Sequence, residues 1–402
     1  MRLRFHQLLL VSLAIGCSQG AGAVTAATLP PYVGAYQPQG VDEIGLWREE
    51  DEQERLLAAS DIVIRDPELN EYVKRVLCDT VGNDRCNATR IYILRIPAFN
   101  ATMAPNGTMR IFSGLLLRVR NEAELGAVLG HEFGHFEQRH SLAGFKNRRT
   151  GTDVIEWASV LAGFSNNQLT WNSFQDVKLA VLGAMYRFDR EQERAADRLG
   201  IAYLNNSRFR PQAAAEIWAS AIREAAASAS VKGLKKPNFN QIAFTASHPP
   251  HGERAGYLAE LALPDAAGRD DGAESYRAAL ATWLPLFLDD QVKLNDFGAT
   301  DYIINSIASE HGWTAALLRA RGDLYRTRGY PRDLIAAAEF YGQAVGLDPG
   351  QAEAHRGLGL VRLKLGHDIE GGQSLKTYLT LKPEAADAKL IAMLIPSMET
   401  TP

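Results

Sequence analysis

The segment His131-Glu132-Phe133-Gly134-His135 constrains this chain more than any other feature of its sequence. Two histidines four residues apart on a helix share one face, about 6 Å apart along the axis, so both imidazoles can bind one metal ion. Zinc suits imidazole ligands and lowers the pKa of a bound water toward neutrality. Glu132 can accept a proton from that water. The segment predicts a site for one zinc ion, with His131 and His135 as ligands and Glu132 as the catalytic base.

The residues before this segment predict that it lies within a helix. Asn121 can cap the first turn, and Glu124 follows three residues later, as in a capping box. The apolar residues that follow recur at helical spacing. We therefore expect a helix from residue 121 to about His140.

The third metal ligand is not fixed by the histidine motif. A metzincin has a third histidine ten residues after the first, and Ser141 occupies that position here. His140 is one residue away and would point elsewhere, as a surface residue or as a partner of a ligand. A thermolysin-like enzyme has a glutamate about 24 residues downstream, near Glu156, but Glu156 lacks the supporting aspartate four residues later.

Glu193 is the better candidate for the third ligand. Glu193 and Asp197 are four residues apart on a predicted helix from residue 190 to about 204, so they share a face. Asp197 could accept the N–H of a ligand histidine and fix its tautomer. The small Ala195 and Ala196 would let this helix approach the first one closely. Glu191 is the alternative ligand within the same segment.

Four separated segments resemble one known peptidase family. His131 to His135 followed by Glu193-x-x-x-Asp197 is similar to the zinc metallopeptidase family that includes HtpX and the CAAX prenyl proteases. The segment 100–116, with its Asn-Ala, Gly and Gly-Leu-Leu motifs, resembles the strand that borders the cleft in that family. Ser247-His248-Pro249 with Arg254 resembles another of its motifs. The matching segments span residues 45–262.

The resemblance implies a zincin-type domain of the α+β class that is mainly helical. It also implies that His248 is a fourth, displaceable zinc ligand that keeps the enzyme latent, although His248 could equally cap a turn. Arg254 would support the metal-site carboxylates, contact substrate or form an ordinary salt bridge. The strand predicted at 109–113 could have an exposed edge that binds substrate backbone as an added strand.

After about residue 268 the amino-acid composition changes, and the sequence shows a repeat. Asp348-Pro349 and Lys382-Pro383 end units that are 34 residues apart, which is the tetratricopeptide period. We therefore expect a peptidase domain at residues 28–268 and an α-helical tetratricopeptide-like domain at residues 269–402. This arrangement resembles the BepA-like branch of the family, which lacks transmembrane helices and is linked to outer-membrane protein assembly.

Residues 1–27 contain the features of an export signal. Two arginines precede the apolar run 8–15, and Ala21-Gly22-Ala23 offers a cleavage site. Gly16-Cys17 offers a competing lipoprotein signal, with a lipid anchor at Cys17. The apolar run is shorter than the roughly 20 residues that a membrane span needs. We expect a periplasmic protein, either free or anchored to the outer membrane.

Cys78 and Cys86 are the remaining cysteines, and an oxidising compartment would favour a disulfide between them over two buried thiols. The net charge of −4 and the lack of a wide basic patch argue against nucleic-acid binding. The expected reaction is hydrolysis of peptide bonds in unfolded or misassembled envelope proteins. The repeats would recruit substrates or the outer-membrane assembly machinery. The alternative is a periplasmic chaperone or assembly adaptor with a latent zinc site.

Overall fold

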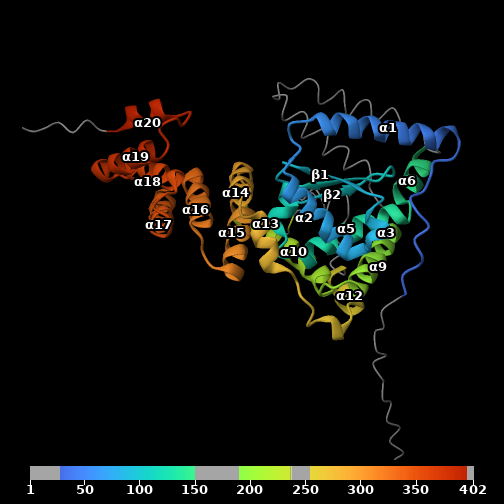
Figure 1. The fold of residues 1–402 in the computed structure, drawn as a ribbon. Coiled ribbons are helices and arrows are strands. Elements are labelled where there is room, and N and C mark those ends of the chain that lie inside the picture. Colours follow the sequence, from blue (N-terminus) through green and yellow to red (C-terminus); the bar gives the residue numbers. More distant parts are fainter. Residues whose placement is uncertain (1–27, 150–189, 236, 238–253, 396–402) are drawn as a thin grey trace, which may run out of the picture.

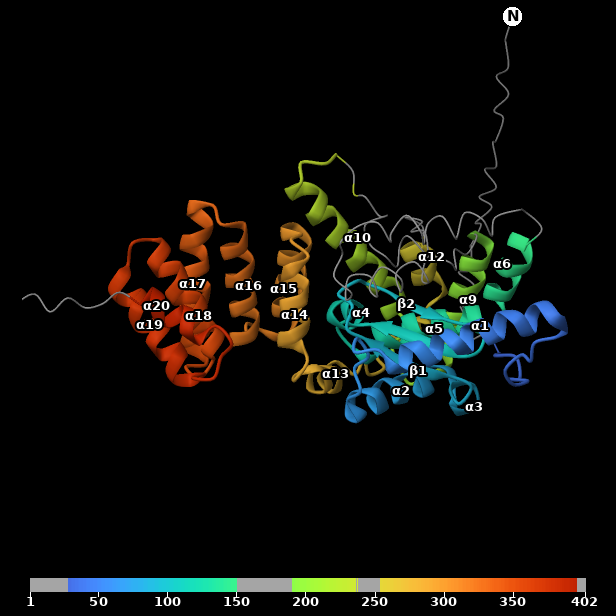
Figure 2. The same ribbon diagram turned by 90° about the horizontal axis from the view of Figure 1, so that it is seen from above.

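The computed structural model describes residues 28–149, 190–235, 237 and 254–395. This part of the chain is mainly helical, as predicted, and Figures 1 and 2 show a sheet-containing body beside a row of helices. None of the described helices combines the length and the apolar character that a bilayer crossing requires. The elements of the body are α1 (Gly40–Ala59), α2 (Pro67–Val81), α3 (Asn83–Cys86), β1 (Arg90–Leu94), β2 (Ala101–Met103), β3 (Thr108–Phe112), α4 (Ser113–Arg118), α5 (Glu122–Glu137), α6 (His140–Arg149), α9 (Arg190–Asn206), α10 (Ala213–Val231), α12 (Arg254–Leu261) and the short η2 (Pro264–Ala266). The row consists of α13 (Ala273–Leu280), α14 (Leu284–Lys293), α15 (Phe297–His311), α16 (Ala315–Arg328), α17 (Pro331–Leu347), α18 (Ala352–Lys364), α19 (Asp368–Leu381) and α20 (Ala388–Leu394).

The three described strands form a mixed sheet in the order β1-β3-β2. β1 pairs with β3 in parallel, and β2 pairs with β3 in antiparallel orientation. The strand predicted at 109–113 is confirmed to within a residue as β3, and the Ile- and Tyr-rich stretch at 90–95 contains β1. The turn-rich connection between them, residues 96–107, contains the third strand, β2. Gly107 has φ +93° and closes the turn between β2 and β3, where a side chain would meet the Ala88 carbonyl.

β3 is the central strand of the sheet, which contradicts the hypothesis of an exposed edge at 109–113. All five residues of β3 are buried. The strand at the edge next to α5 is β2, which packs against that helix. The reason is topological: the chain runs through the short strand β2 before it enters β3, so β3 gains a neighbour on each side.

The sheet lies between α1 on one face and α2 and α5 on the other (Figure 1). α1 is fastened to the sheet by polar contacts, among them Glu50 with Arg110 at 3.1 Å and Glu54 with Arg90 at 2.5 Å. Burial raises the pKa of Glu50, although Arg110 counteracts it. The Pro- and Gly-rich segment at residues 29–40 leads into α1, which begins at Gly40.

Cys78 at the end of α2 and Cys86 in α3 form a disulfide with an S–S distance of 2.02 Å. Cys86 is fully buried in the core that α2 shares with α5. The disulfide therefore holds α3 against the helix that packs beneath the metal-binding segment.

One hydrophobic core runs from the body into the row of helices. It includes Leu125 and Phe133 of α5, and it continues through Phe287 of α14, Ile303 of α15 and Leu317 of α16. The predicted domain boundary at residue 268 stays a prediction, and the core is continuous across it. Shared burial of this kind makes the first helices of the row part of the same packed unit.

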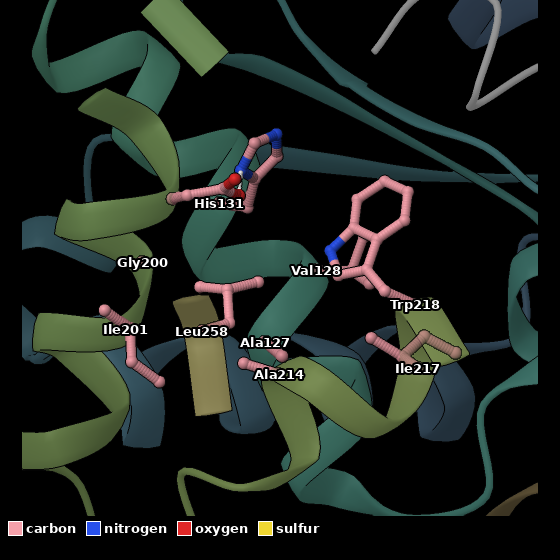
Figure 3. Close-up of a pocket in the computed structure, with 10 residues that line it drawn as sticks. Ala127, Val128, His131, Gly200, Ile201, Ala214, Ile217, Trp218 and Leu258 are labelled. Atoms are coloured by element: carbon pink, nitrogen blue, oxygen red, sulfur yellow. Dashed lines mark ion pairs between the residues drawn. The ribbon is translucent and has the colours of Figure 1, made fainter. Parts of the chain in front are cut away.

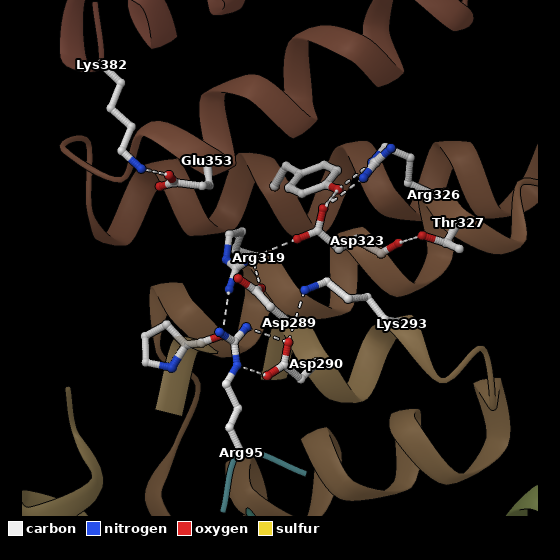
Figure 4. A network of polar contacts seen from close by, with 12 residues as sticks. Arg95, Asp289, Asp290, Lys293, Arg319, Asp323, Arg326, Thr327, Glu353 and Lys382 are labelled. Carbon is white, nitrogen blue, oxygen red and sulfur yellow. Dashed lines mark hydrogen bonds and ion pairs between the residues drawn. The ribbon is translucent and has the colours of Figure 1, made fainter. Parts of the chain in front are cut away.

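A network of ion pairs accompanies that core at the junction (Figure 4). Arg95, next to β1, binds Asp290 of α14 with an Nε–Oδ2 distance of 2.6 Å. Arg319 of α16 is buried and binds Asp289 of α14 at 2.5 Å and Asp323 at 2.9 Å. The junction is thus fixed in register by charge as well as by apolar packing.

The last helices form two antiparallel hairpins, α16 with α17 and α18 with α19. In the first, Gly322 faces the ring of Tyr341, and a Cβ at Gly322 would lie 2.7 Å from it. In the second, a Cβ at Gly359 would lie 2.6 Å from Leu375. The glycine and the large residue thus repeat from one hairpin to the next.

Candidate metal centre

α5 presents the histidine motif, and its local sequence explains why the helix forms there. The Asn121 side chain accepts a hydrogen bond from the Glu124 backbone N–H at 2.8 Å, and Glu124 accepts one from the Arg120 N–H at 2.7 Å. The predicted cap is therefore confirmed, and the helix ends at Glu137, three residues earlier than expected. The helical spacing brings the Nε2 atoms of His131 and His135 to 3.1 Å of each other.

α9 brings Glu193 to the two histidines. Its Oε1 lies 3.4 Å from Nε2 of His135, and its Oε2 lies 3.6 Å from Nε2 of His131. Glu193 is 1% exposed. The rival Glu191 lies on the same helix, but its side chain is 83% exposed.

Small residues allow this close approach of α9 to α5. A Cβ at Gly134 would lie 3.1 Å from the Ala196 carbonyl oxygen, and one at Gly200 would lie 3.2 Å from the backbone of His131. The sequence had indicated Ala195 and Ala196 for this role. The structure adds two glycines, one on each helix, which leave no room for a side chain between the two backbones.

The three donor groups fit a metal ion. One ligand atom from each of His131, His135 and Glu193 lies within 4.8 Å of the others. Zinc–nitrogen bonds of about 2.05 Å at tetrahedral angles place neighbouring ligand atoms about 3.3 Å apart. Here the two Nε2 atoms are 3.1 Å apart, and each lies near a different oxygen of Glu193, at 3.4 Å for His135 and 3.6 Å for His131. All three side chains are buried. Two imidazoles and one carboxylate with this spacing suit a tetrahedral divalent cation.

Asp197 and Arg254 support these ligands. Oδ1 of Asp197 lies 2.9 Å from Nδ1 of His131, so Nδ1 can carry the proton while Nε2 faces the other ligands. Arg254 donates to both oxygens of Asp197, at 2.8 and 2.5 Å, and lies 3.1 Å from Glu193. The guanidinium is almost fully buried. Of the roles considered for Arg254, the structure places it on the carboxylates.

The charges of this cluster shift its pKa values. Burial lowers the pKa of His131, which favours the neutral imidazole that binds metals, although Asp197 counteracts it. Burial alone would raise the pKa of Asp197, but the charge of Arg254 and the bond to His131 outweigh it, so that pKa lies well below its usual range. Asp197 is therefore ionised throughout the physiological range.

Residues 64–262 match the family described as Peptidase family M48, and several curated relatives match parts of the chain. The chain belongs to peptidase family M48. M48 peptidases are metal-dependent, which agrees with the cluster of two histidines and a glutamate. The family match ends at residue 262, directly after α12 and before η2 and the row of helices.

The relatives of this M48 chain share part of their length with it. The mitochondrial metalloendopeptidase OMA1 of Schizosaccharomyces pombe is 27% identical over 214 residues, which cover 53% of this chain and 57% of that protein. The beta-barrel assembly-enhancing protease of Yersinia pestis is 31% identical over 168 residues, 40% of this chain and 34% of that protein. The Escherichia coli protein of the same name is 27% identical over 164 residues, with the same coverage. The chain thus spans between a third and three fifths of these relatives.

The remaining predicted residues divide into two groups. Glu132 follows His131 on α5 and is buried, and His140 lies behind the second ligand, with its Nδ1 2.9 Å from Nδ1 of His135. The second group, Cys17, Glu156 and His248, lies outside the described residues.

Two aromatic residues that the sequence did not indicate complete the surroundings of Arg254. The ring of Trp218 on α10 lies 3.8 Å from the guanidinium carbon, a cation–π contact, and the hydroxyl of Tyr257 donates to Asp197. Trp218 belongs to an apolar helix face, so only the packing of α10 on α5 reveals it. Tyr257 follows Arg254 by three residues, a helical spacing that could have indicated it.

A small cavity lies beside His131 (Figure 3). Its volume is about 20 Å³, enough for one water molecule, and most of its wall is aliphatic, from α5, α9 and α10. Asp197 and Trp218 also line it. The supporting side of the metal cluster therefore lies against a mostly aliphatic wall, which strengthens its charge interactions.

Proposed function

We propose that this chain is a zinc-dependent metalloendopeptidase that cleaves unfolded or misassembled proteins of the cell envelope. The observation that carries the proposal is the buried cluster of His131, His135 and Glu193, whose donor atoms have the spacing of zinc ligands. Three protein ligands leave one corner of a tetrahedral ion for water or substrate, which is typical of catalytic rather than structural zinc.

The roles of the residues follow from their positions. Bound zinc would polarise a peptide carbonyl and acidify water. Glu132 is the proposed base, which accepts the proton of the attacking water and returns it to the leaving amine. Asp197 keeps His131 in the tautomer with Nε2 unprotonated. Arg254 balances the charges of Asp197 and Glu193 and holds both carboxylates in place.

β2 is the proposed binding edge for the substrate backbone. Within the described part of the chain it pairs on one side only, with β3, and it packs against α5. The side-chain oxygen of Asn100, immediately before β2, is buried and has no hydrogen-bond partner among the described residues. An extended substrate added along β2 would bind through its backbone, which gives cleavage with little side-chain selectivity.

The location and the wider role rest on other observations. The Cys78–Cys86 disulfide is typical of an oxidising compartment such as the periplasm, and two of the relatives are named beta-barrel assembly-enhancing proteases. We propose a periplasmic enzyme, with the signal at residues 1–27 either cleaved or lipidated at Cys17. His248 is the proposed fourth, displaceable ligand.

The paired helices of the C-terminal part support a tetratricopeptide-like array. The repeated contact of a glycine with a large side chain, Gly322 with Tyr341 and Gly359 with Leu375, gives both hairpins the same close packing. Stacked hairpins form an extended surface that can recruit partners. We propose that this surface binds substrates or the outer-membrane assembly machinery. No observation on the described residues favours an adaptor that does not cleave.

Replacement of Glu132 tests the proposal. Glu132→Gln should keep one zinc per chain and lose cleavage of casein and of an unfolded outer-membrane barrel protein by at least about 100-fold. Glu193→Gln should lose zinc, whereas the matched Glu191→Gln, on the exposed face of the same helix, should keep both zinc and activity. The proposal that this chain is a zinc enzyme would be refuted if the wild-type protein contained no stoichiometric zinc and its activity were unaffected by chelators. Full biological activity in Glu132→Gln would instead support the adaptor.

A further inference from the structure

His135 and His131 have different partners behind the metal-binding edge. The Nδ1 of His131 faces a carboxylate, Asp197, at 2.9 Å. The Nδ1 of His135 faces another imidazole, the Nδ1 of His140, also at 2.9 Å. The rings of His135 and His140 meet edge to face, with centroids 5.0 Å apart, and both are buried. His140 is therefore a built contact of the site and not a surface histidine.

The tautomers of this pair follow from which atom binds metal. The Nε2 of His135 faces Nε2 of His131 and Oε1 of Glu193, so this atom must be unprotonated to serve as a ligand. A neutral imidazole then carries its proton on Nδ1. That proton points at His140, whose Nδ1 must accept it. His140 cannot be a ligand of the same ion in this arrangement, because it contacts the other nitrogen of the His135 ring.

The backbone makes a turn between α5 and α6, and this turn directs His140 toward His135. α5 ends at Glu137, and Arg139 adopts a left-handed conformation with φ 59°, which is uncommon for a residue other than glycine. Its guanidinium lies 4.8 Å from the ring centroid of Tyr36 in the N-terminal segment. On the other side, the Gln138 side chain donates to the Ala195 carbonyl of α9 at 3.1 Å. Contacts on both sides thus hold the turn in its unfavourable conformation.

We propose that His140 is a positioning residue that accepts the Nδ1–H of His135 and thereby orients this ligand for the metal. The inference rests on the proposed zinc site and goes beyond it by assigning a role to a fourth histidine. Hydrogen bonds of this kind fix the ring and raise the basicity of a ligand, and their loss costs about 10- to 100-fold in metal affinity. The Nδ1 of His131 faces a carboxylate for this purpose, whereas the Nδ1 of His135 faces an imidazole.

Two variants with similarly branched side chains test the role. Asn at position 140 can place its side-chain oxygen near the present Nδ1, whereas Leu is close to histidine in volume and has no acceptor. We expect His140→Leu to raise the dissociation constant for zinc about 10- to 100-fold in competition with a chelator, and His140→Asn to stay within a few-fold of wild type. Urea unfolding of the metal-free proteins should give similar stabilities for the two variants.

NMR spectra of the cobalt-substituted proteins distinguish a role of His140 in orienting His135 from a role in packing alone. Wild type should show the exchangeable Nδ1–H resonances of both ligand histidines, and His140→Leu should lose one of them through faster exchange with water, while His140→Asn keeps it. Equal zinc affinity and equal spectra in His140→Leu and wild type would overturn the inference, as would equal losses in both variants. A wild-type protein that binds no zinc would instead refute the proposed function on which the inference rests.

Discussion

Gly200 lies where α9 approaches α5 most closely, and one added methyl group there tests whether helix spacing sets the metal affinity. A Cβ at Gly200 would lie 3.2 Å from both the N and the Cα of His131. Carbon contacts relax at about 3.5 Å, so α9 would move outward by about 0.3 Å. Glu193 lies seven residues earlier on the same face of α9, so its carboxylate would retreat with the helix.

Two effects compete in the stability of Gly200→Ala. Alanine in place of glycine within a helix gains up to about 1 kcal/mol, whereas overpacking costs about 1–3 kcal/mol. The free energy of unfolding of the metal-free protein should therefore fall by at most about 3 kcal/mol. The distances from Glu193 to the two histidines, now 3.4 and 3.6 Å, would grow to about 3.7 and 3.9 Å, beyond tetrahedral spacing. We expect the zinc dissociation constant to rise about 10- to 100-fold.

Gly342 of α17 provides the matched control, because a Cβ there would meet nothing within 4 Å. Gly342→Ala should stabilise the protein by up to about 1 kcal/mol and leave zinc binding unchanged. Chelator competition gives the affinities, and urea unfolding of the metal-free proteins gives the stabilities. If Gly200→Ala binds zinc as wild type does and gains the same stability as Gly342→Ala, the contact between the helices is loose and the reasoning is wrong.

Three further predictions concern other buried groups. Burial raises the pKa of Glu124 to about 7 from an ordinary 4.5, so between these pH values the folded chain retains a proton that the unfolded chain releases. The free energy of unfolding should therefore fall by about 3 kcal/mol as the pH rises from about 4.5 to about 7. Glu124→Gln should remove this pH dependence in denaturant titrations at several pH values. Arg254→Met leaves the neighbouring carboxylates without their counter-charge and should destabilise the metal-free protein by about 3–5 kcal/mol, with partial recovery on adding zinc in thermal melts. Reduction of the Cys78–Cys86 disulfide should cost about 2.5 kcal/mol, and a double Cys→Ala variant that unfolds at the wild-type urea midpoint would contradict this.

Local patterns predicted the helix that carries the histidine motif and its partner helix. The Asn121 cap, the spacing of His131 and His135 and the four-residue step from Glu193 to Asp197 all depend on the geometry of a single helix. Such features are determined by residues that are close in sequence, so they can be predicted without knowledge of the rest of the fold.

Other elements could not be predicted, because distant packing decides them. β2 has only three residues and lies in a turn-rich stretch, and it becomes a strand because β3 offers it a partner. The polar α1 is fastened by Glu50 and Glu54 to arginines of strands that come later in the chain. Trp218 contributes through its contact with Arg254, which is created when α10 packs near α12.

The sequence by itself determined which side chains could form a metal centre in this M48 chain, since a helical turn brings His131 and His135 onto one face wherever that helix lies. Only the tertiary structure decided that Glu193, and not the exposed Glu191, meets them, and that His140 turns back to the second ligand. The physical reason is the distance along the sequence over which each feature is determined. A turn of helix is set by bonds within four residues, whereas the approach of two helices depends on which positions, such as Gly134 and Gly200, leave no side chain between their backbones.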